Sequence, residues 1–168
     1  MTRDLTFYRR RDIAVMVVLA GLGFYLFKAL FVIGMPSPKF SGCLTHKIFL
    51  VSKLEEDVVR GGIYAVSMDR DLKIAKKGEK LMKIVAATGG DKVRVDLDGV
   101  WVNEKTYYPV PLHGIAGRLK IPESEVMKTI TVPAGHLYLI GNTDRSYDSR
   151  FWGTIDEKNV IGRAITVM

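Results

Sequence analysis

The sequence predicts a mainly β protein, in which a domain of antiparallel β-sheet follows one N-terminal transmembrane helix. Three observations support this fold class. An apolar run lies near the N-terminus, a proline-containing break follows it, and short β-branched segments separated by turn residues make up the rest. The chain has 168 residues, of which 48% are hydrophobic and 26% charged, enough for one domain with a core and an anchor.

The apolar run covers residues 13–35, and its only charged side chain is Lys28. A helix of this length rises about 34 Å, which exceeds the hydrocarbon thickness of about 30 Å. Backbone groups in lipid must be paired within the segment, so a span is helical. We therefore expect a transmembrane helix over 13–35 that ends before Pro36-Ser37-Pro38.

The basic segment 1–12 predicts the orientation of this helix. Arg9, Arg10 and Arg11 directly precede the apolar run. Under the positive-inside rule residues 1–12 are cytoplasmic, and residues 36–168 form the extracytoplasmic domain. Two alternatives stay open: a cleaved signal peptide with its apolar region at 13–27, and a buried core helix. Lys28 either extends to the interface or pairs with a partner helix.

Short segments of high β propensity predict the strands of the domain. The Asp98-Gly99 pair predicts a two-residue hairpin turn between two of them. Residues 105–130 contain three prolines and are expected to be irregular, with one short helix beginning at Pro122. The expected strands cover residues 48–51, 63–66, 84–86, 93–97, 100–103, 136–140 and 161–167.

Charge and cysteine content exclude several classes of protein. The formal net charge of +7 has no lysine or arginine block beyond the N-terminus, so we predict no nucleic-acid partner. Cys43 is the single cysteine, which excludes an intramolecular disulfide and a cysteine cluster for metal. The three histidines have no metal-binding spacing, and we predict neither a metal nor another cofactor.

Three segments carry the candidate chemistry. The first is Ser41-Gly42-Cys43-Leu44, shortly after the apolar run. The second, residues 83–93, reads KIVAATGGDKV. The third, residues 141–153, reads GNTDRSYDSRFWG.

In this order the three segments resemble the type I signal peptidases, the serine–lysine peptidases of bacterial membranes. The resemblance extends from about residue 36 to the C-terminus, and the run Ser146-x-Asp148-Ser-Arg150-x-Trp-Gly is its most specific part. It implies a signal-peptidase-like catalytic domain, anchored in the bacterial inner membrane and facing the periplasm. It also implies an endopeptidase whose partners are the bilayer and an exported precursor protein.

The resemblance also implies a role for each matched residue. Cys43 occupies the position of the nucleophile, and Lys83 that of the general base. Ser41 matches the hydroxyl that, with the Cys43 backbone N–H, forms the oxyanion hole. Ser146 matches the serine that hydrogen-bonds the lysine. Asp148 and Arg150 match a structural ion pair beside the site.

The sequence departs from the family pattern at several positions. Cysteine replaces serine at 43, no proline follows in Leu44-Thr45-His46-Lys47, and Asn142 stands where an aspartate is common. These departures resemble the conjugative branch, which processes pilin precursors and in some members joins the new ends into a cyclic pilin. A thiol beside a lysine can exist as a thiolate–ammonium pair and is a strong nucleophile.

Two other functions remain open from the sequence. A catalytically inactive component of a pilus or secretion assembly would explain the cysteine and the missing proline. A cysteine–histidine peptidase would use His46, His113 or His136 in place of Lys83. His46 lies so close to Cys43 in sequence that a strand would point the two side chains in different directions.

Overall fold

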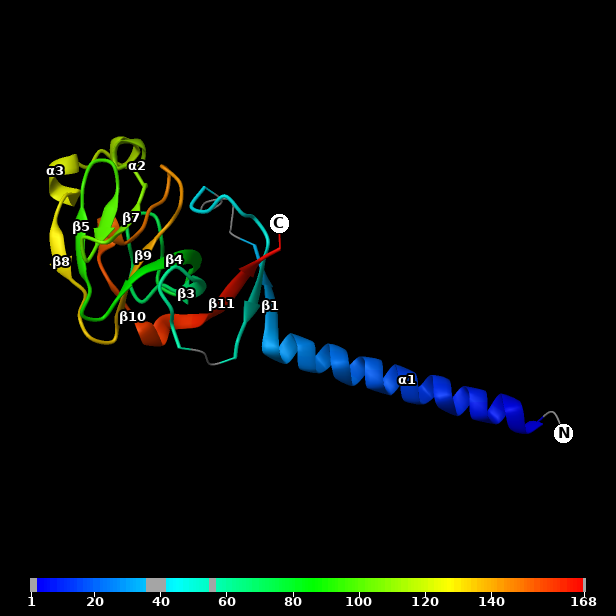
Figure 1. The fold of residues 1–168 in the computed structure, drawn as a ribbon. Coiled ribbons are helices and arrows are strands. Elements are labelled where there is room, and N and C mark those ends of the chain that lie inside the picture. The colour runs from blue at the N-terminus through cyan, green and yellow to red at the C-terminus, as the bar shows by residue number, and fades with distance from the viewer. Residues whose placement is uncertain (1–2, 36–41, 55–56, 168) are drawn as a thin grey trace.

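The computed structural model describes residues 3–35, 42–54 and 57–167. Helix α1 (Arg3–Leu30) projects away from a β-rich domain that contains everything after it (Figure 1). The segment Arg9–Leu30 has a mean hydropathy of 2.2, and none of it is buried against the domain. By length and composition this helix can cross a membrane, since 22 residues rise about 33 Å.

The end of the apolar run differs from the prediction. The helix was expected over 13–35, but it ends at Leu30, and strand β1 (Phe31–Gly34) pairs antiparallel with β2 (Phe49–Ser52). Lys53 N–H donates to the Leu30 carbonyl at 2.8 Å, so the sheet satisfies backbone groups that the helix leaves free. Helix α1 therefore passes into the sheet without a linker.

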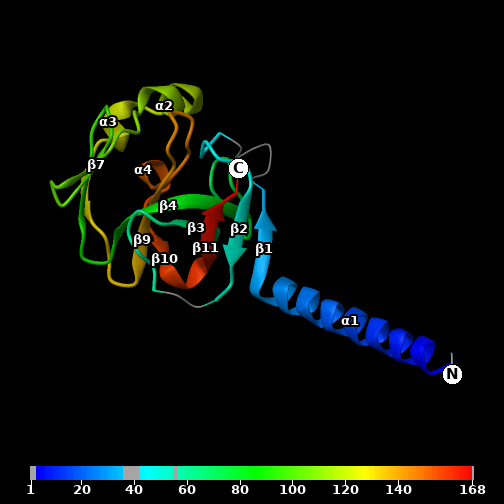
Figure 2. The ribbon, with the colours of Figure 1, turned by 45° about the vertical axis from the view of Figure 1, so that its right-hand side comes forward.

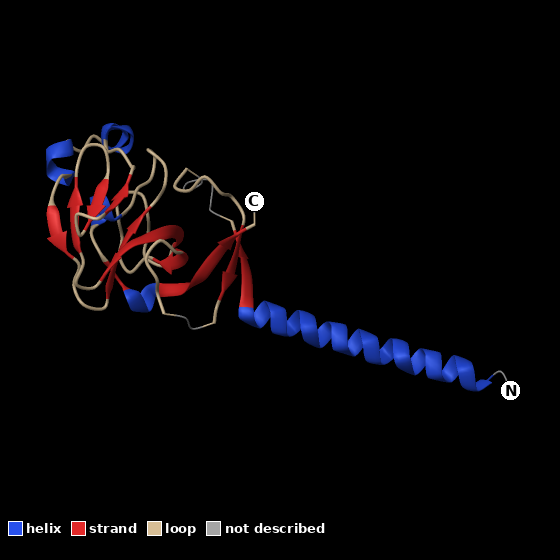
Figure 3. Cartoon of the chain, viewed as in Figure 1, coloured by secondary structure: helices blue, strands red, loops and turns tan. Residues whose placement is uncertain are grey.

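Two antiparallel sheets make up the domain (Figure 3). The larger has seven strands in the order β1-β2-β11-β3-β4-β9-β10, and the smaller has four in the order β7-β6-β5-β8. The remaining strands are β3 (Ile63–Ser67), β4 (Lys80–Thr88), β5 (Lys92–Val95), β6 (Val100–Val102), β7 (Thr106–Tyr108), β8 (Thr129–Thr131), β9 (His136–Ile140), β10 (Ile155–Asp156) and β11 (Val160–Thr166).

The predicted antiparallel β domain is confirmed, and so are the seven predicted strands within a few residues. The Asp98-Gly99 turn closes with a hydrogen bond from Asp96 N–H to the Gly99 carbonyl at 2.9 Å. The expectation of an irregular segment 105–130 was wrong in part. That segment contains β7, helix α2 (His113–Leu119), the predicted short helix α3 (Glu123–Val126) and the start of β8, because side chains such as Ile115 and Val126 pack into the core.

The four-stranded sheet and helices α2 and α3 lie at the end of the domain away from α1, while β1 and β2 lie at the end next to α1 (Figure 2). Two further short helices, α4 (Ser149–Trp152) and the 3-10 turn η1 (Glu157–Asn159), flank β10. Strand β4 contributes to two buried hydrophobic clusters. Leu81 and Val85 belong to one cluster, and Ala86 and Ala87 belong to the other. Lys83 lies on this central strand.

Candidate active site

Lys83 is a lysine in the interior of a sheet. It lies between Leu81 and Val85 on the same face of β4, opposite Tyr64 of β3, and its side chain is completely buried. Burial of an ammonium without compensation is costly, so a lysine in this position needs a polar partner.

Ser146 is the polar partner of Lys83. The Lys83 Nζ donates to the Ser146 Oγ at 2.8 Å, and Ser146 is itself fully buried. Ser146 is far from Lys83 in sequence, and it lies in the loop that links β9 to α4. The structure thus brings together two of the residues that the resemblance predicts in one site.

Asp148 and Arg150 form a fully buried ion pair next to Ser146. Arg150 Nε donates to Asp148 Oδ1 at 2.8 Å, and Arg150 Nη2 donates to Asp148 Oδ2 at 2.9 Å. Nη2 also donates to the Ser146 carbonyl at 3.1 Å, and Asp148 Oδ2 accepts a second hydrogen bond, from Gly141 N–H at 3.0 Å. The pair therefore fixes both the backbone of Ser146 and the backbone of Gly141.

The electrostatics of the pair favour the charged forms. Burial raises the pKa of Asp148, but the Arg150 charge and its hydrogen bonds outweigh burial and hold that pKa below its usual value. The Lys83 charge acts on the Asp148 pKa in the same direction. Burial lowers the pKa of Arg150, and Asp148 more than offsets this, so the Arg150 pKa is raised.

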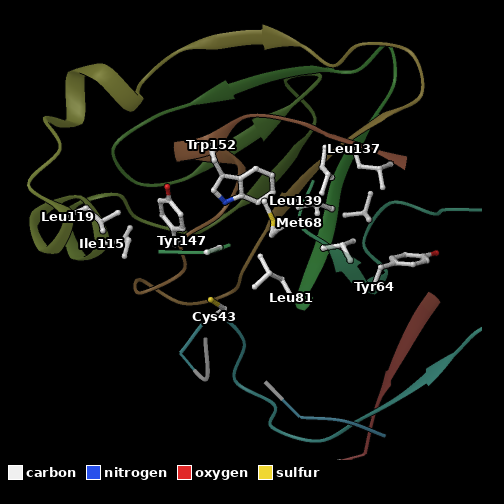
Figure 4. Close-up of a cluster of buried hydrophobic side chains, with 14 residues drawn as sticks. Cys43, Tyr64, Met68, Leu81, Ile115, Leu119, Leu137, Leu139, Tyr147 and Trp152 are labelled. Carbon is white, nitrogen blue, oxygen red and sulfur yellow. The ribbon is translucent and has the colours of Figure 1, made fainter. Parts of the chain in front are cut away.

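Cys43 is buried, with 6% of its surface exposed, and belongs to the same hydrophobic cluster as Leu81 of β4 (Figure 4). Val85 of β4 belongs to this cluster too. Its carbonyl accepts from Asn142 N–H at 3.1 Å. A β-carbon on Gly141 would overlap both this carbonyl and the Ser146 hydroxyl. Gly141 is thus the point where the Cys43 segment meets the partner of Lys83, and only glycine allows that approach.

The proposed oxyanion residue Ser41 lies outside the described residues. Gly141, Asn142 and Thr45 were not predicted as site residues, although Gly141 and Asn142 belong to the third motif. Asn142 contacts Thr45 through its side chain, and the two are 97 residues apart in sequence. A contact of that range leaves no periodic signal in the sequence.

The hydrogen bonds of the histidines within the described part of the chain involve groups other than Cys43. His46 is exposed, and its Nδ1 lies 3.3 Å from the Thr45 hydroxyl. His113 is exposed at the start of α2, and His136 Nδ1 contacts the Ala134 carbonyl at 3.1 Å. In residues 3–35, 42–54 and 57–167, no group of three or more His, Cys, Asp or Glu side chains could hold a metal ion.

Comparison with known proteins gives consistent matches. The model of a family described as signal peptidase, peptidase S26, matches residues 10–168. A probable signal peptidase I-2 of Synechocystis sp. is 30% identical over 112 residues, which are 64% of this chain and 47% of that protein. A signal peptidase I of Buchnera aphidicola is 48% identical over 40 residues, 23% of this chain and 13% of that one.

This chain therefore spans about half the length of the first of these relatives and less of the second. Among solved structures, a signal peptidase I from Enterococcus faecalis aligns with a TM-score of 0.44 and 21% identity. That alignment covers 66% of this chain and 98% of the other.

Proposed function

This chain belongs to the signal peptidase, peptidase S26, family, and from that premise we propose that it is a membrane-anchored endopeptidase that cleaves an exported precursor. We propose Cys43 as its nucleophile and Lys83 as its general base. The observation that carries this proposal is the completely buried Lys83, bonded to Ser146 at 2.8 Å beside the backbone of Cys43.

The arrangement supplies what acyl transfer requires. The completely buried Lys83 amine is the proposed proton acceptor. The Ser146 hydroxyl fixes the direction of the Lys83 amine, and the Asp148–Arg150 pair fixes Ser146. A proton acceptor that is held in position in this way needs little reorganisation during the reaction.

In the proposed reaction the Cys43 thiol transfers its proton to Lys83, and Sγ attacks the carbonyl carbon of the scissile peptide. The carbon–nitrogen bond breaks, the leaving amine takes the proton from Lys83, and a thioester to Cys43 forms. Water then attacks the thioester while Lys83 accepts its proton. The carboxyl product leaves, and the thiol regains its proton. The Cys43 N–H and Ser41 are proposed to stabilise the oxyanion.

The proposed location follows from helix α1. Its span can anchor the chain, and Arg9, Arg10 and Arg11 at the start of that span favour a cytoplasmic N-terminus. The domain would then face the periplasm, where an inner-membrane precursor presents its cleavage site. The departures at Cys43, Leu44 and Asn142 support a precursor of the conjugative pilin type. Small residues before the cut are expected because the pocket of the family is shallow.

Coexpression of the full chain with a pilin-type precursor tests this proposal. The variants are Cys43→Ser, Cys43→Ala and Lys83→Ala, and the readout is the mass of the precursor. Processing by the parent and failure of both alanine variants are the expected results. A product lighter than the linear form by one water would show that an amine, and not water, resolves the thioester.

The other outcomes favour the alternatives. If Cys43→Ser processes the precursor and the parent does not, the cysteine is a disabling replacement in a serine enzyme. If the parent and all three variants are inert with every exported precursor tried, the result favours the inactive assembly component over the endopeptidase. If Lys83→Ala keeps its activity but a histidine variant loses it, the base is a histidine.

A further inference from the structure

We infer that Asn142 and Thr45 are positioning residues that hold the Cys43 segment against the site, an inference that rests on the proposed function. Several hydrogen bonds near the nucleophile position join the turn after β9, at Asn142–Thr143, to the segment Gly42–Thr45.

The side chain of Asn142 makes two bonds with one residue. Thr45 N–H donates to Asn142 Oδ1 at 3.0 Å, and Asn142 Nδ2 donates to the Thr45 Oγ1 at 3.1 Å. A carboxamide can accept and donate at once, which leucine, alanine or any aliphatic side chain cannot do. The Asn142–Thr45 contact therefore fixes both the backbone and the side chain of the residue that follows Leu44.

The backbone continues the same contact on the other side of Cys43. Asn142 N–H donates to the Cys43 carbonyl at 3.1 Å, and the Thr143 hydroxyl donates to the Gly42 carbonyl. Hydrogen bonds from the Asn142–Thr143 turn are thus made to Gly42, to the Cys43 carbonyl and to Thr45. Because these bonds lie before, at and after Cys43, they limit rotation of its backbone and set the direction of its side chain.

Gly141 links these hydrogen bonds to Lys83, the proposed base. A β-carbon on Gly141 would overlap the Cys43 carbonyl and the Ser146 hydroxyl that accepts from Lys83, so these two groups meet at this glycine. The residue that follows it, Asn142, binds Thr45. A shift of the Asn142 backbone would therefore change the position of Cys43 relative to the Lys83–Ser146 bond. Misplacement of a reacting group by about 1 Å can cost on the order of a hundredfold in rate.

Both side chains of the contact are exposed, which separates this role from core packing. Asn142 and Thr45 are both on the surface, so substitution at either removes hydrogen bonds without creating a cavity. The Thr45 hydroxyl also lies 3.3 Å from His46 Nδ1, the only other side-chain contact of this hydroxyl within the described ranges.

The test uses the full-length protein in detergent with its precursor. Asn142→Leu removes both side-chain bonds, Thr45→Val removes one, and Thr45→Ser keeps the hydroxyl. Thr129→Val, on exposed β8, is the matched control. We expect kcat to fall roughly 10- to 100-fold in Asn142→Leu and roughly tenfold in Thr45→Val, with KM changed far less. Thr45→Ser restores most of the loss, and the control matches the parent.

A second readout does not depend on activity. Cys43 is the only cysteine, so iodoacetamide alkylation reports on it alone. Cys43 is only 6% exposed, and loss of these hydrogen bonds makes its thiol more accessible. Alkylation is therefore faster in Asn142→Leu and Thr45→Val, while the melting temperature of both variants stays close to that of the parent. Thr45→Val carries the test if Asn142→Leu does not fold.

The two proposals fail in different ways. If the parent processes the precursor and both variants keep kcat within about twofold, the positioning role is overturned and the proposed function stands. If the parent is inert, the proposed function fails, and unchanged alkylation in both variants overturns the positioning role separately. Equal kinetic loss in Thr45→Ser and Thr45→Val would also overturn it, since the hydroxyl would then be irrelevant.

Discussion

Two regions of this domain use the same pair of chemical groups in different surroundings. At the start of α4, the Arg150–Asp148 pair is completely buried and bonds to backbone on both sides. On the four-stranded sheet at the distal end of the domain, Arg94 contacts Glu104 at 2.9 Å and also Asp96, and these three side chains are between 35% and 54% exposed. Buried charges lie at the candidate site, and partly exposed charges lie on the distal sheet.

This difference shows where charge has a structural effect. The charges of an exposed ion pair are well solvated by water even when they are apart, so the pair contributes little to the free energy of unfolding. A buried pair whose partner is lost leaves a charge in a poorly solvated interior. Substitutions near Lys83 and Ser146 should therefore have large effects, and matched substitutions on the distal sheet small ones.

The largest difference is expected between Lys83 and its neighbour Lys80 on β4. Lys83→Met removes the buried amine that bonds to Ser146, so processing of the precursor is lost while the protein stays folded. Lys80→Met changes an exposed side chain on the same strand and leaves processing unchanged. Processing assays and far-UV circular dichroism on both variants check this, and residual processing by folded Lys83→Met would remove lysine from the mechanism.

Arg150→Met should destabilise the protein strongly. It leaves Asp148 buried without its partner, at a cost of about 3–5 kcal/mol in the free energy of unfolding. Arg94→Met, on the exposed cluster, should leave that free energy nearly unchanged. Urea unfolding of the two variants measures the contrast, and equal effects would show that burial does not decide the contribution of these pairs.

Gly141→Ala should cost less stability than Arg150→Met, but it acts directly on the site. The added methyl overlaps the Cys43 carbonyl and the Ser146 hydroxyl, so one of them must move. Overpacking of this kind costs about 1–3 kcal/mol, and processing should fall with it. Gly117 on α2 has open space for a β-carbon, so Gly117→Ala is the control. It should be neutral or slightly stabilising.

The smallest effect concerns pH. Because the pKa of Asp148 is lower in the folded state, its stabilisation is present above the ordinary value of 3.8 and is lost as the pH falls toward the lower native pKa. The double variant Asp148→Asn/Arg150→Met has no buried pair and should lose less stability on acidification than the parent. Glu104→Gln on the exposed cluster should follow the parent. Thermal melts between about pH 5 and pH 2 check both.

The sequence is sufficient to predict the parts of this structure that depend on local pattern. Alternation and turn residues predicted β5, the Asp98-Gly99 turn and β6, and the motifs predicted that Lys83 and Ser146 share a site. It could not predict β1, since Phe31, Val32 and Ile33 are as suitable for lipid as for a strand, and only the partner β2 decides between them.

Long-range contacts account for the rest of what sequence reasoning missed. Strand β8 pairs with β5 across the proline-containing segment, so its short Thr-Ile-Thr run carried too weak a local signal. The contact of Asn142 with Thr45 depends on how β9 places its following turn. The resemblance drew attention to Asn142 only as a departure from a common aspartate.

The most direct test of the account is whether Cys43 carries the acyl group. The full-length protein is mixed with its precursor, quenched in acid within seconds, and measured by intact mass spectrometry. The account predicts a hydroxylamine-sensitive adduct on the parent, with the mass of the amino-terminal fragment of the precursor, and none on Cys43→Ala. Processing of the precursor by Cys43→Ala at the rate of the parent would contradict it.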